Sequence, residues 1–296
     1  MQFRKISLKD KAIFDRFLSC RMPQLSAYAF ENIFIWQSLY DIFWAKINKS
    51  LCVFFKDRVG CFLYLSPLGK ANGEDTVEKC FEIMDGFNNN PVVSRIENAE
   101  ERDLDFYKGL GYKTVLAGCD YVCKKEALAD LKGEAFKKKR ALANNFVNKY
   151  NFQYLIYKPG DKKECIRLYL SWMKERKSQN SDRIYQGLLD DNFAVFKAML
   201  ECFGKLNFTG RVVKIGGRIR AFTFGYELNS DSFVILFEVC DLKLKGIAQY
   251  IFREFSRELD YKDINIMDDS GLASLKKVKL SYRPYRTLNC FSVNRG

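Results

Sequence analysis

The stretch of sequence that decides the fold is residues 238–249, which read EVCDLKLKGIAQ. It completes an apolar segment expected to be a strand (residues 232–240) and opens a segment expected to be a helix (residues 247–259). Backbone amides at a helix N-terminus, together with the helix dipole, bind phosphate, and small residues let the backbone approach it. The stretch therefore predicts a strand–loop–helix unit with a phosphate site, whose candidate residues are Lys243, Lys245, Gly246, Ile247 and Ala248. The alternative is a helix that simply begins after a basic turn.

The segments on either side predict two α/β halves with a similar order of elements. In the second half we expect strands at residues 152–157, 208–215, 218–226, 232–240, 264–267 and 287–293, and helices at 161–174, 190–203, 247–259 and 272–279. In the first half we expect strands at 3–8, 42–47, 50–55, 60–65 and 92–96, helices at 10–20, 29–40 and 74–86, and a closing helix and strand that end at residue 123. The repeated order divides the chain into residues 1–126 and 127–296, with a basic helix at about 133–150 joining the halves.

The composition allows well-packed cores and favours an anionic partner. Of the 296 residues, 48% are hydrophobic and 15% are aromatic, which is ample for two domains. The net charge is +13, which favours tRNA, phosphate-bearing nucleotide cofactors or anionic lipid as partners. A basic surface that only maintains solubility is the alternative.

The absence of histidine excludes several kinds of chemistry. Ser-His-Asp and Cys-His catalysis, histidine general bases and zinc sites built on histidine are all ruled out. The ten cysteines are scattered among apolar neighbours, so we expect reduced, buried thiols and no metal site. Because residues 1–10 do not resemble a signal peptide and no apolar stretch is long enough to cross a bilayer, we expect a cytoplasmic protein.

Two features resemble GNAT acyltransferases. The spacing Lys243-x-x-Gly246-x-Ala248 is similar to the pyrophosphate loop of that family, with Lys in place of the usual Arg or Gln. Residues 95–99 and 106–113 resemble the strand and helix that close a GNAT domain. The resemblance implies an α/β (α+β) fold of two tandem GNAT-like domains, each a mixed central sheet flanked by helices. It also implies an acyl-CoA donor as one option.

Three separated motifs resemble the DUF2156 family. Residues 26–36 read SAYAFENIFIW, residues 131–146 contain Leu131-x-Gly133 and the KKKR run, and residues 268–284 contain DDSGL and the final KLSYRP. That family is akin to the C-terminal catalytic domain of phosphatidylglycerol lysyltransferases, which move an aminoacyl group from charged tRNA to a lipid hydroxyl. The chain departs from it by lacking a membrane-spanning part and by having no histidine in the basic segment.

The combined patterns suggest roles for particular residues in an aminoacyl transfer. Glu238 or the pair Asp268 and Asp269 would accept a proton, and Lys279 would stabilise charge. The run Lys137, Lys138, Lys139 and Arg140 would bind tRNA, with a solvated helix face as its alternative. We expect no tightly bound cofactor and no metal, with aminoacyl-tRNA or acyl-CoA as the donor.

Three classes of function stay open at this point. The first is aminoacyl-tRNA-dependent transfer to a lipid or another small acceptor, with peripheral contact to anionic membrane lipid. The second is acyl-CoA-dependent N-acyl transfer. The third is a tRNA-binding or regulatory protein without turnover. The acceptor and the oligomeric state are left open by the sequence.

Overall fold

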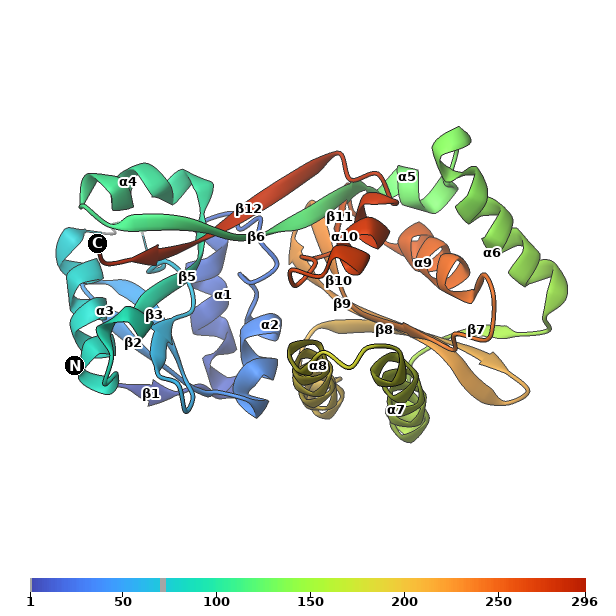
Figure 1. The fold of residues 1–296 in the computed structure, drawn as a ribbon, viewed down its shortest axis with the longest axis horizontal. Coiled ribbons are helices and arrows are strands. Elements are labelled where there is room, and N and C mark those ends of the chain that lie inside the picture. The colour runs from blue at the N-terminus through green and yellow to red at the C-terminus, as the bar shows by residue number, and fades with distance from the viewer. Residues whose placement is uncertain (1, 70–72) are drawn as a thin grey trace. The chain divides into compact units, whose positions relative to one another are not determined.

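A computed structural model describes residues 2–69 and 73–296 as two compact units (Figure 1). Unit 1 contains the chain up to Asp120 together with residues 268–272 and 287–296. Unit 2 contains residues 121–267 and 273–286. The sequence predicted two domains that divide between residues 126 and 127, and this stays a prediction. The compact units differ from it in that residues 268–272 and 287–296 belong to unit 1.

Unit 1 is built on strands in the order β1-β2-β3-β4-β5-β12. Their bounds are Arg4–Lys5 (β1), Asp41–Ile47 (β2), Ser50–Lys56 (β3), Cys61–Leu63 (β4), Arg95–Glu100 (β5) and Arg286–Asn294 (β12), whose first residue belongs to unit 2. The β4–β5 pair is parallel and the other pairs are antiparallel. The helices are Lys11–Ser19 (α1), Phe30–Ile35 (α2), Glu74–Phe87 (α3) and Leu104–Gly109 (α4).

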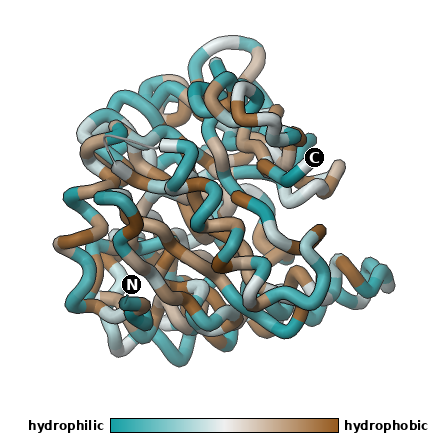
Figure 2. The backbone as a smooth tube through the Cα atoms, turned by 90° about the vertical axis from the view of Figure 1, so that its left-hand side faces the viewer, coloured by the Kyte–Doolittle hydropathy of each residue, from teal (hydrophilic) through white to brown (hydrophobic). Residues whose placement is uncertain are grey.

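Hydrophobic spacing explains these elements. In α3 the buried residues Val77, Cys80, Phe81 and Met84 recur at helical intervals and cover one face. In β3 nearly every residue is buried, as expected for a strand covered on both sides. In Figure 2, hydrophobic and hydrophilic stretches alternate along the tube, as expected for elements that each have a buried and an exposed side.

Unit 2 continues from β6 with strands in the order β6-β11-β10-β9-β8-β7. Their bounds are Lys113–Lys124 (β6, which enters from unit 1), Asp263–Asn265 (β11), Ser232–Cys240 (β10), Arg218–Asn229 (β9), Phe208–Ile215 (β8) and Gln153–Ile156 (β7). Only the β10–β11 pair is parallel among these neighbours. The helices are Lys125–Asp130 (α5), Lys137–Lys149 (α6), Lys162–Gln179 (α7), Arg183–Cys202 (α8), Ile247–Glu258 (α9) and Ala273–Leu280 (α10).

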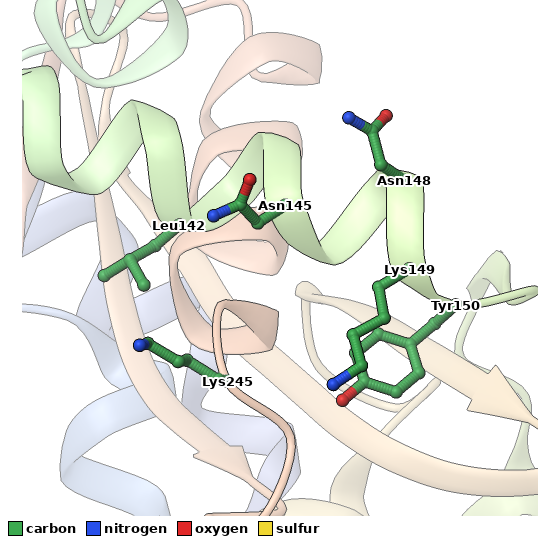
Figure 3. Close-up of a pocket in the computed structure, with 6 residues that line it drawn as sticks. All are labelled: Leu142, Asn145, Asn148, Lys149, Tyr150 and Lys245. Carbon is green, nitrogen blue, oxygen red and sulfur yellow. The ribbon is translucent and has the colours of Figure 1, made fainter.

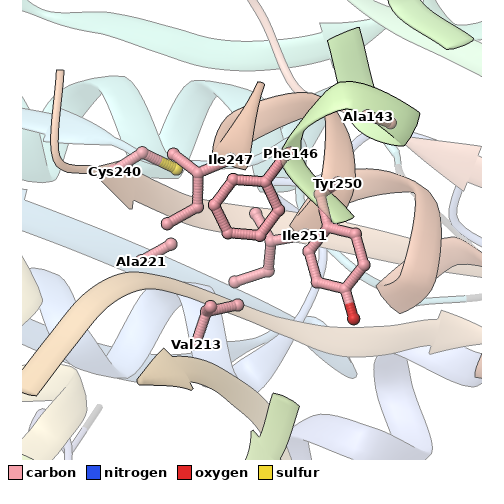
Figure 4. Close-up of a cluster of buried hydrophobic side chains, with 8 residues drawn as sticks. All are labelled: Ala143, Phe146, Val213, Ala221, Cys240, Ile247, Tyr250 and Ile251. Carbon is pink, nitrogen blue, oxygen red and sulfur yellow. The ribbon is translucent and has the colours of Figure 1, made fainter. Parts of the chain in front are cut away.

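The sheet of unit 2 has a hydrophobic core on each face. Figure 1 shows α7 and α8 on one side of β8–β10, and α6 and α9 on the other. On the α7–α8 side, the ring of Phe196 stacks on that of Phe222, with 4.9 Å between centroids. On the α6–α9 side, a buried cluster joins both helices to the sheet (Figure 4); it consists of Ala143, Phe146, Val213, Ala221, Cys240, Ile247, Tyr250 and Ile251.

The architecture confirms the expected mixed α/β class and most of the expected strands, and it corrects several boundaries. The helix expected from residue 190 begins at Arg183, because Asp182 caps it by accepting a hydrogen bond from the backbone N–H of Tyr185 (2.8 Å). The strand expected at 92–96 is a 3₁₀ turn (Pro91–Val93) followed by β5. The hairpin between β8 and β9 turns on Gly216 and Gly217, both with positive φ.

Helix α6 approaches α9 so closely that only glycine fits at position 246. Gly246 has a φ of +93°, and a Cβ placed there would lie 2.2 Å from the carbonyl oxygen of Leu142. We expect Gly246→Ala to cost about 1–2 kcal/mol for the left-handed backbone and about 1–3 kcal/mol more for displacing α6. Thermal or urea unfolding measures this loss.

Gly204→Ala provides the matched control for this prediction. Gly204 also has a left-handed φ (+85°), but a Cβ there would meet nothing within 4 Å. Its substitution should therefore cost only the backbone contribution. Equal losses in the two variants would show that the contact between α6 and Gly246 contributes nothing.

Candidate active site

The candidate active site lies where β10 extends beyond its neighbour β11. Strand β11 ends at Asn265, so it pairs only with residues 232–234 of β10. The remainder of β10, which carries Glu238, continues along β9, where Glu238 lies opposite Thr223. A register shift between Ile235 and Phe237 inserts one extra residue into β10 before this point. Because β11 is short and β10 has this bulge, the side chain of Glu238 lies inside unit 2 at a place where β10 has no neighbour from β11.

The side chain of Glu238 is half-buried, and one of its carboxyl oxygens lies wholly inside unit 2. This Oε2 atom is inaccessible to solvent and accepts no hydrogen bond from the residues that the structure describes. Burial raises the pKa of Glu238 to about 8, although the charges of Lys279 and Lys139 act in the opposite direction. A carboxyl group with a pKa near neutrality can both take up and release a proton during a reaction.

Lys139 of α6 points into this site. Its ammonium group donates a hydrogen bond to the hydroxyl of Ser281 (2.7 Å) and lies 3.7 Å from the centre of the Tyr282 ring. Burial lowers the pKa of Lys139, while the nearby carboxyl of Glu238 raises it. One member of the predicted tRNA-binding run is thus a neighbour of the candidate proton acceptor.

Lys279 and Tyr282 bring the end of α10 to the same place. The ammonium group of Lys279 donates to the carbonyl oxygen of Ile266, directly after β11. The ring of Tyr282 is 7% exposed and packs 4.3 Å from that of Phe252. Burial holds the pKa of the Tyr282 hydroxyl well above its ordinary value, so it stays protonated.

The thiols around the site are inert. Burial raises the pKa of Cys123 to about 12 and also raises that of Cys240 well above its ordinary value. Since the thiolate is the reactive form, neither cysteine is prepared to act as a nucleophile. Within residues 2–69 and 73–296, no group of three or more Cys, Asp or Glu side chains is arranged to hold a metal ion. The titratable groups gathered here are a carboxyl group with a raised pKa and two lysines.

The loop after β10 is only partly accessible. Asp241 shapes it by pairing with Arg220 (2.9 Å) and by accepting a hydrogen bond from the backbone N–H of Lys243 (3.0 Å). The side chains of Lys243 and Lys245 are exposed. Gly246 and Ile247 are buried beneath α6, and Ala248 is half-buried. The small size of Gly246 thus allows α6 to pack closely, and a phosphate-binding role for this loop stays a prediction.

The structure separates the basic run into an outer and an inner pair. Lys137 and Lys138 are exposed, and Lys137 forms an ion pair with Glu134 (3.4 Å). Arg140 instead donates to the backbone carbonyls of Leu131 and Gly133. Of the four residues, only Lys137 and Lys138 are oriented as the predicted nucleic-acid contact requires.

Asp268 and Asp269 shape a turn in unit 1. Asp268 accepts a hydrogen bond from the backbone N–H of Ser270 (3.1 Å), and Asp269 accepts one from that of Gly271 (3.0 Å). Glu238, Lys139 and Lys279 belong to unit 2, which brings these three together. A role for the two aspartates in proton transfer stays a prediction.

The sequence contained a signal for Lys139 that composition alone conceals. Positions 139, 143, 146 and 150 fall on one side of a helix, and the last three are alanine or aromatic residues. A lysine at the first of these positions is therefore directed toward the core side of α6. Ser281 and Tyr282 follow α10 by one and two residues and carry no catalytic signature by themselves.

Comparisons with known proteins agree with this architecture. The chain is similar to a conserved protein of unknown function from Bacteroides thetaiotaomicron, with 25% identity, full coverage of both chains and a TM-score of 0.85. It is also similar to the structure of L-PGS from Bacillus licheniformis, with 16% identity, 97% and 92% coverage and a TM-score of 0.65. A tandem GNAT protein from the clavulanic acid biosynthesis pathway shares the fold at a TM-score of 0.53, with 8% identity and 100% and 98% coverage.

A sequence relative is an uncharacterized protein of Mycoplasmoides gallisepticum, 26% identical over 208 residues. The match covers 65% of this chain and 64% of that protein, which is less than two thirds of its length.

The fold class is that of tandem GNAT-like proteins, as the sequence led us to expect. The family model for the C-terminal region of phosphatidylglycerol lysyltransferase matches residues 21–294. The chain belongs to this family, which confirms the resemblance found in its three motifs. None of the helices in the described parts of the chain is both long and apolar enough to cross a membrane.

The raised pKa of Glu238 predicts a specific dependence of stability on pH. Between the ordinary value of 4.5 and about 8, the unfolded chain releases a proton that the folded protein keeps. The wild type therefore loses stability as the pH rises through this window, by at most about 1.4 kcal/mol per pH unit. Glu238→Gln does not titrate at this position. The difference between its melting temperature and that of the wild type should therefore shift in favour of the variant from pH 5 to pH 8.

Asp191→Asn, at an exposed carboxylate of α8, is the control for this measurement. Its melting temperature should differ from that of the wild type by an amount that does not grow between pH 5 and pH 8. A constant difference for Glu238→Gln as well would show that Glu238 titrates normally.

Proposed function

We propose that this chain is an aminoacyltransferase that takes its aminoacyl group from a charged tRNA. The observation that carries the proposal is the buried carboxyl of Glu238, with its pKa of about 8, under the influence of Lys139 and Lys279. Membership of the phosphatidylglycerol lysyltransferase C-terminal family supports transfer of an amino acid to a lipid hydroxyl. The net charge of +13 suits both a polyanionic donor and an anionic membrane surface that holds such an acceptor.

The reaction needs little from the protein beyond positioning and proton transfer. The hydroxyl or amine of the acceptor attacks the carbonyl carbon of the aminoacyl ester, and the bond from that carbon to the terminal ribose oxygen breaks. Ionised Glu238 takes the proton from the attacking group and returns it to the departing ribose oxygen. Lys139 or Lys279 stabilises the negative charge that develops on the carbonyl oxygen.

The accessibility of the loop after β10 favours tRNA over acyl-CoA as the donor. A pyrophosphate-binding loop requires exposed backbone around its small residues, but Gly246 and Ile247 are buried under α6. The exposed lysines of the loop and of α6 suit the more widely spaced phosphates of a polynucleotide.

Transfer of radiolabel from a mixed pool of charged tRNAs to bacterial lipid extract tests the proposal. We expect labelled lipid with the wild type and a loss of about 10²–10⁴-fold in rate with Glu238→Gln, the usual range for removing a general base. Asp191→Asn should retain full activity. If the wild type neither labels an acceptor nor releases the amino acid from tRNA, the proposed donor is wrong.

The inner and outer lysines of α6 should have separable effects. Lys137→Ala/Lys138→Ala should weaken tRNA binding and reduce the slope of log affinity against log salt by about 2, one for each lost phosphate contact. Lys139→Met should lower the transfer rate and leave that slope unchanged. Fluorescence anisotropy with labelled tRNA, in a series of KCl concentrations, provides the slopes.

Lys163→Met, at an exposed lysine of α7, is the control for both measurements. A salt slope that falls equally in Lys139→Met and in the outer pair would contradict the inward placement of Lys139.

A further inference from the structure

A shallow pocket of about 380 Å³ lies between the outer side of α6 and the loop that precedes α9 (Figure 3). Lys245 forms one wall, and α6 with the residue that follows it forms the other. The lining residues are Leu142, Asn145, Asn148, Lys149, Tyr150 and Lys245. The volume falls in the range of pockets that bind small molecules. All six residues belong to unit 2.

The close contact between α6 and α9 fixes the position of both walls. Leu142 lines the pocket with its side chain, while its carbonyl oxygen packs against Gly246, the residue after Lys245. Tyr150 is held by the ring of Phe146, whose centroid is 5.2 Å away. Lys149 and Lys245 are therefore carried by elements that share one packed core.

The pocket has positive charge that the protein does not neutralise. Neither Lys149 nor Lys245 takes part in an ion pair among the residues that the structure describes, and no carboxylate lines the pocket. Asn145 and Asn148 are exposed and supply hydrogen-bond donors and acceptors. Two lysines with amides and a tyrosine ring suit an anion that also carries hydrogen-bonding groups, as a nucleotide does.

We propose that this pocket binds a phosphate group of the nucleotide part of the acyl donor. The inference rests on the proposed function and deepens it, because it assigns Asn145, Asn148, Lys149 and Tyr150 to donor binding. Lys245 follows Glu238 by only seven residues, a span of at most about 25 Å. A donor whose ester lies at Glu238 can thus reach the pocket with a phosphate a few nucleotide units from its reacting end.

Equilibrium binding to two probes tests the pocket without requiring turnover. The probes are fluorescently labelled, uncharged bacterial tRNA, followed by anisotropy, and coenzyme A, followed by calorimetry. We expect Lys149→Ala/Lys245→Ala to weaken tRNA binding about 10–100-fold at 100 mM KCl and to reduce the salt slope by about 1, for the one phosphate that the pocket holds. Asn145→Asp, which places a carboxylate in the pocket, should also weaken binding.

Lys163→Ala/Lys205→Ala is the control, because it removes two exposed lysines from the same unit at other places. A selective loss of tRNA binding in the pocket variants identifies tRNA as the source of the phosphate, and a selective loss of coenzyme A binding identifies that nucleotide instead. If the pocket variants lose no more affinity than the control for either probe, the pocket is not a phosphate site.

The same variants separate this inference from the proposed function. Loss of tRNA binding in the pocket variants, with a wild type that transfers nothing, would retain the pocket and overturn the aminoacyltransferase proposal. If the wild type transfers the amino acid, and the pocket variants keep their affinity and KM for charged tRNA, the aminoacyltransferase proposal is retained and the pocket is overturned.

Discussion

The contact between the Leu142 carbonyl of α6 and Gly246 is the constraint on which the rest of unit 2 depends. It requires a residue without a side chain at position 246, because the backbone of α6 lies directly against the backbone at the start of α9. With α6 at this distance, Lys139 faces the interior beside Glu238, and Lys149 faces the solvent beside Lys245. One backbone contact thus determines which basic residues of a single helix serve the buried site and which face the surface.

The buried carboxyl of Glu238 illustrates how a fold retains a costly group. An apolar residue on β10 would satisfy the strand and the core better, because an unpaired buried carboxyl is expensive. The cost is limited because burial leaves the group largely protonated at neutral pH, and the two lysines make its ionised form less unfavourable than burial alone would. Such unfavourable arrangements concentrate at functional sites, where they are compensated by the surrounding structure.

The sequence predicted the fold class and the strand–loop–helix unit at 238–249 because hydrophobic period and turn chemistry are local signals. It also predicted Glu238 and Lys279 as candidates. It grouped Lys139 with the exposed members of its charge run, and only the helical face shows that Lys139 lies beside Glu238. The close approach of α6 to Gly246 arises from tertiary packing, which no local pattern shows, and the predicted roles of Lys139 and Gly246 in binding stay predictions. The pocket beside Lys149 and Lys245 joins segments nearly a hundred residues apart, which no local pattern reveals.

The path of the chain through the two units bears on how such a protein can be divided. Strand β12 completes unit 1 by pairing with β5, although the residues of unit 2 separate the two strands in the sequence. A fragment that ends near residue 126 would leave β5 without this antiparallel neighbour, and the complementary fragment would carry a strand with no place in its own unit. The tandem halves are therefore not interchangeable modules, and an exchange of unit 1 between relatives would have to include residues 287–296 together with the segment up to Asp120.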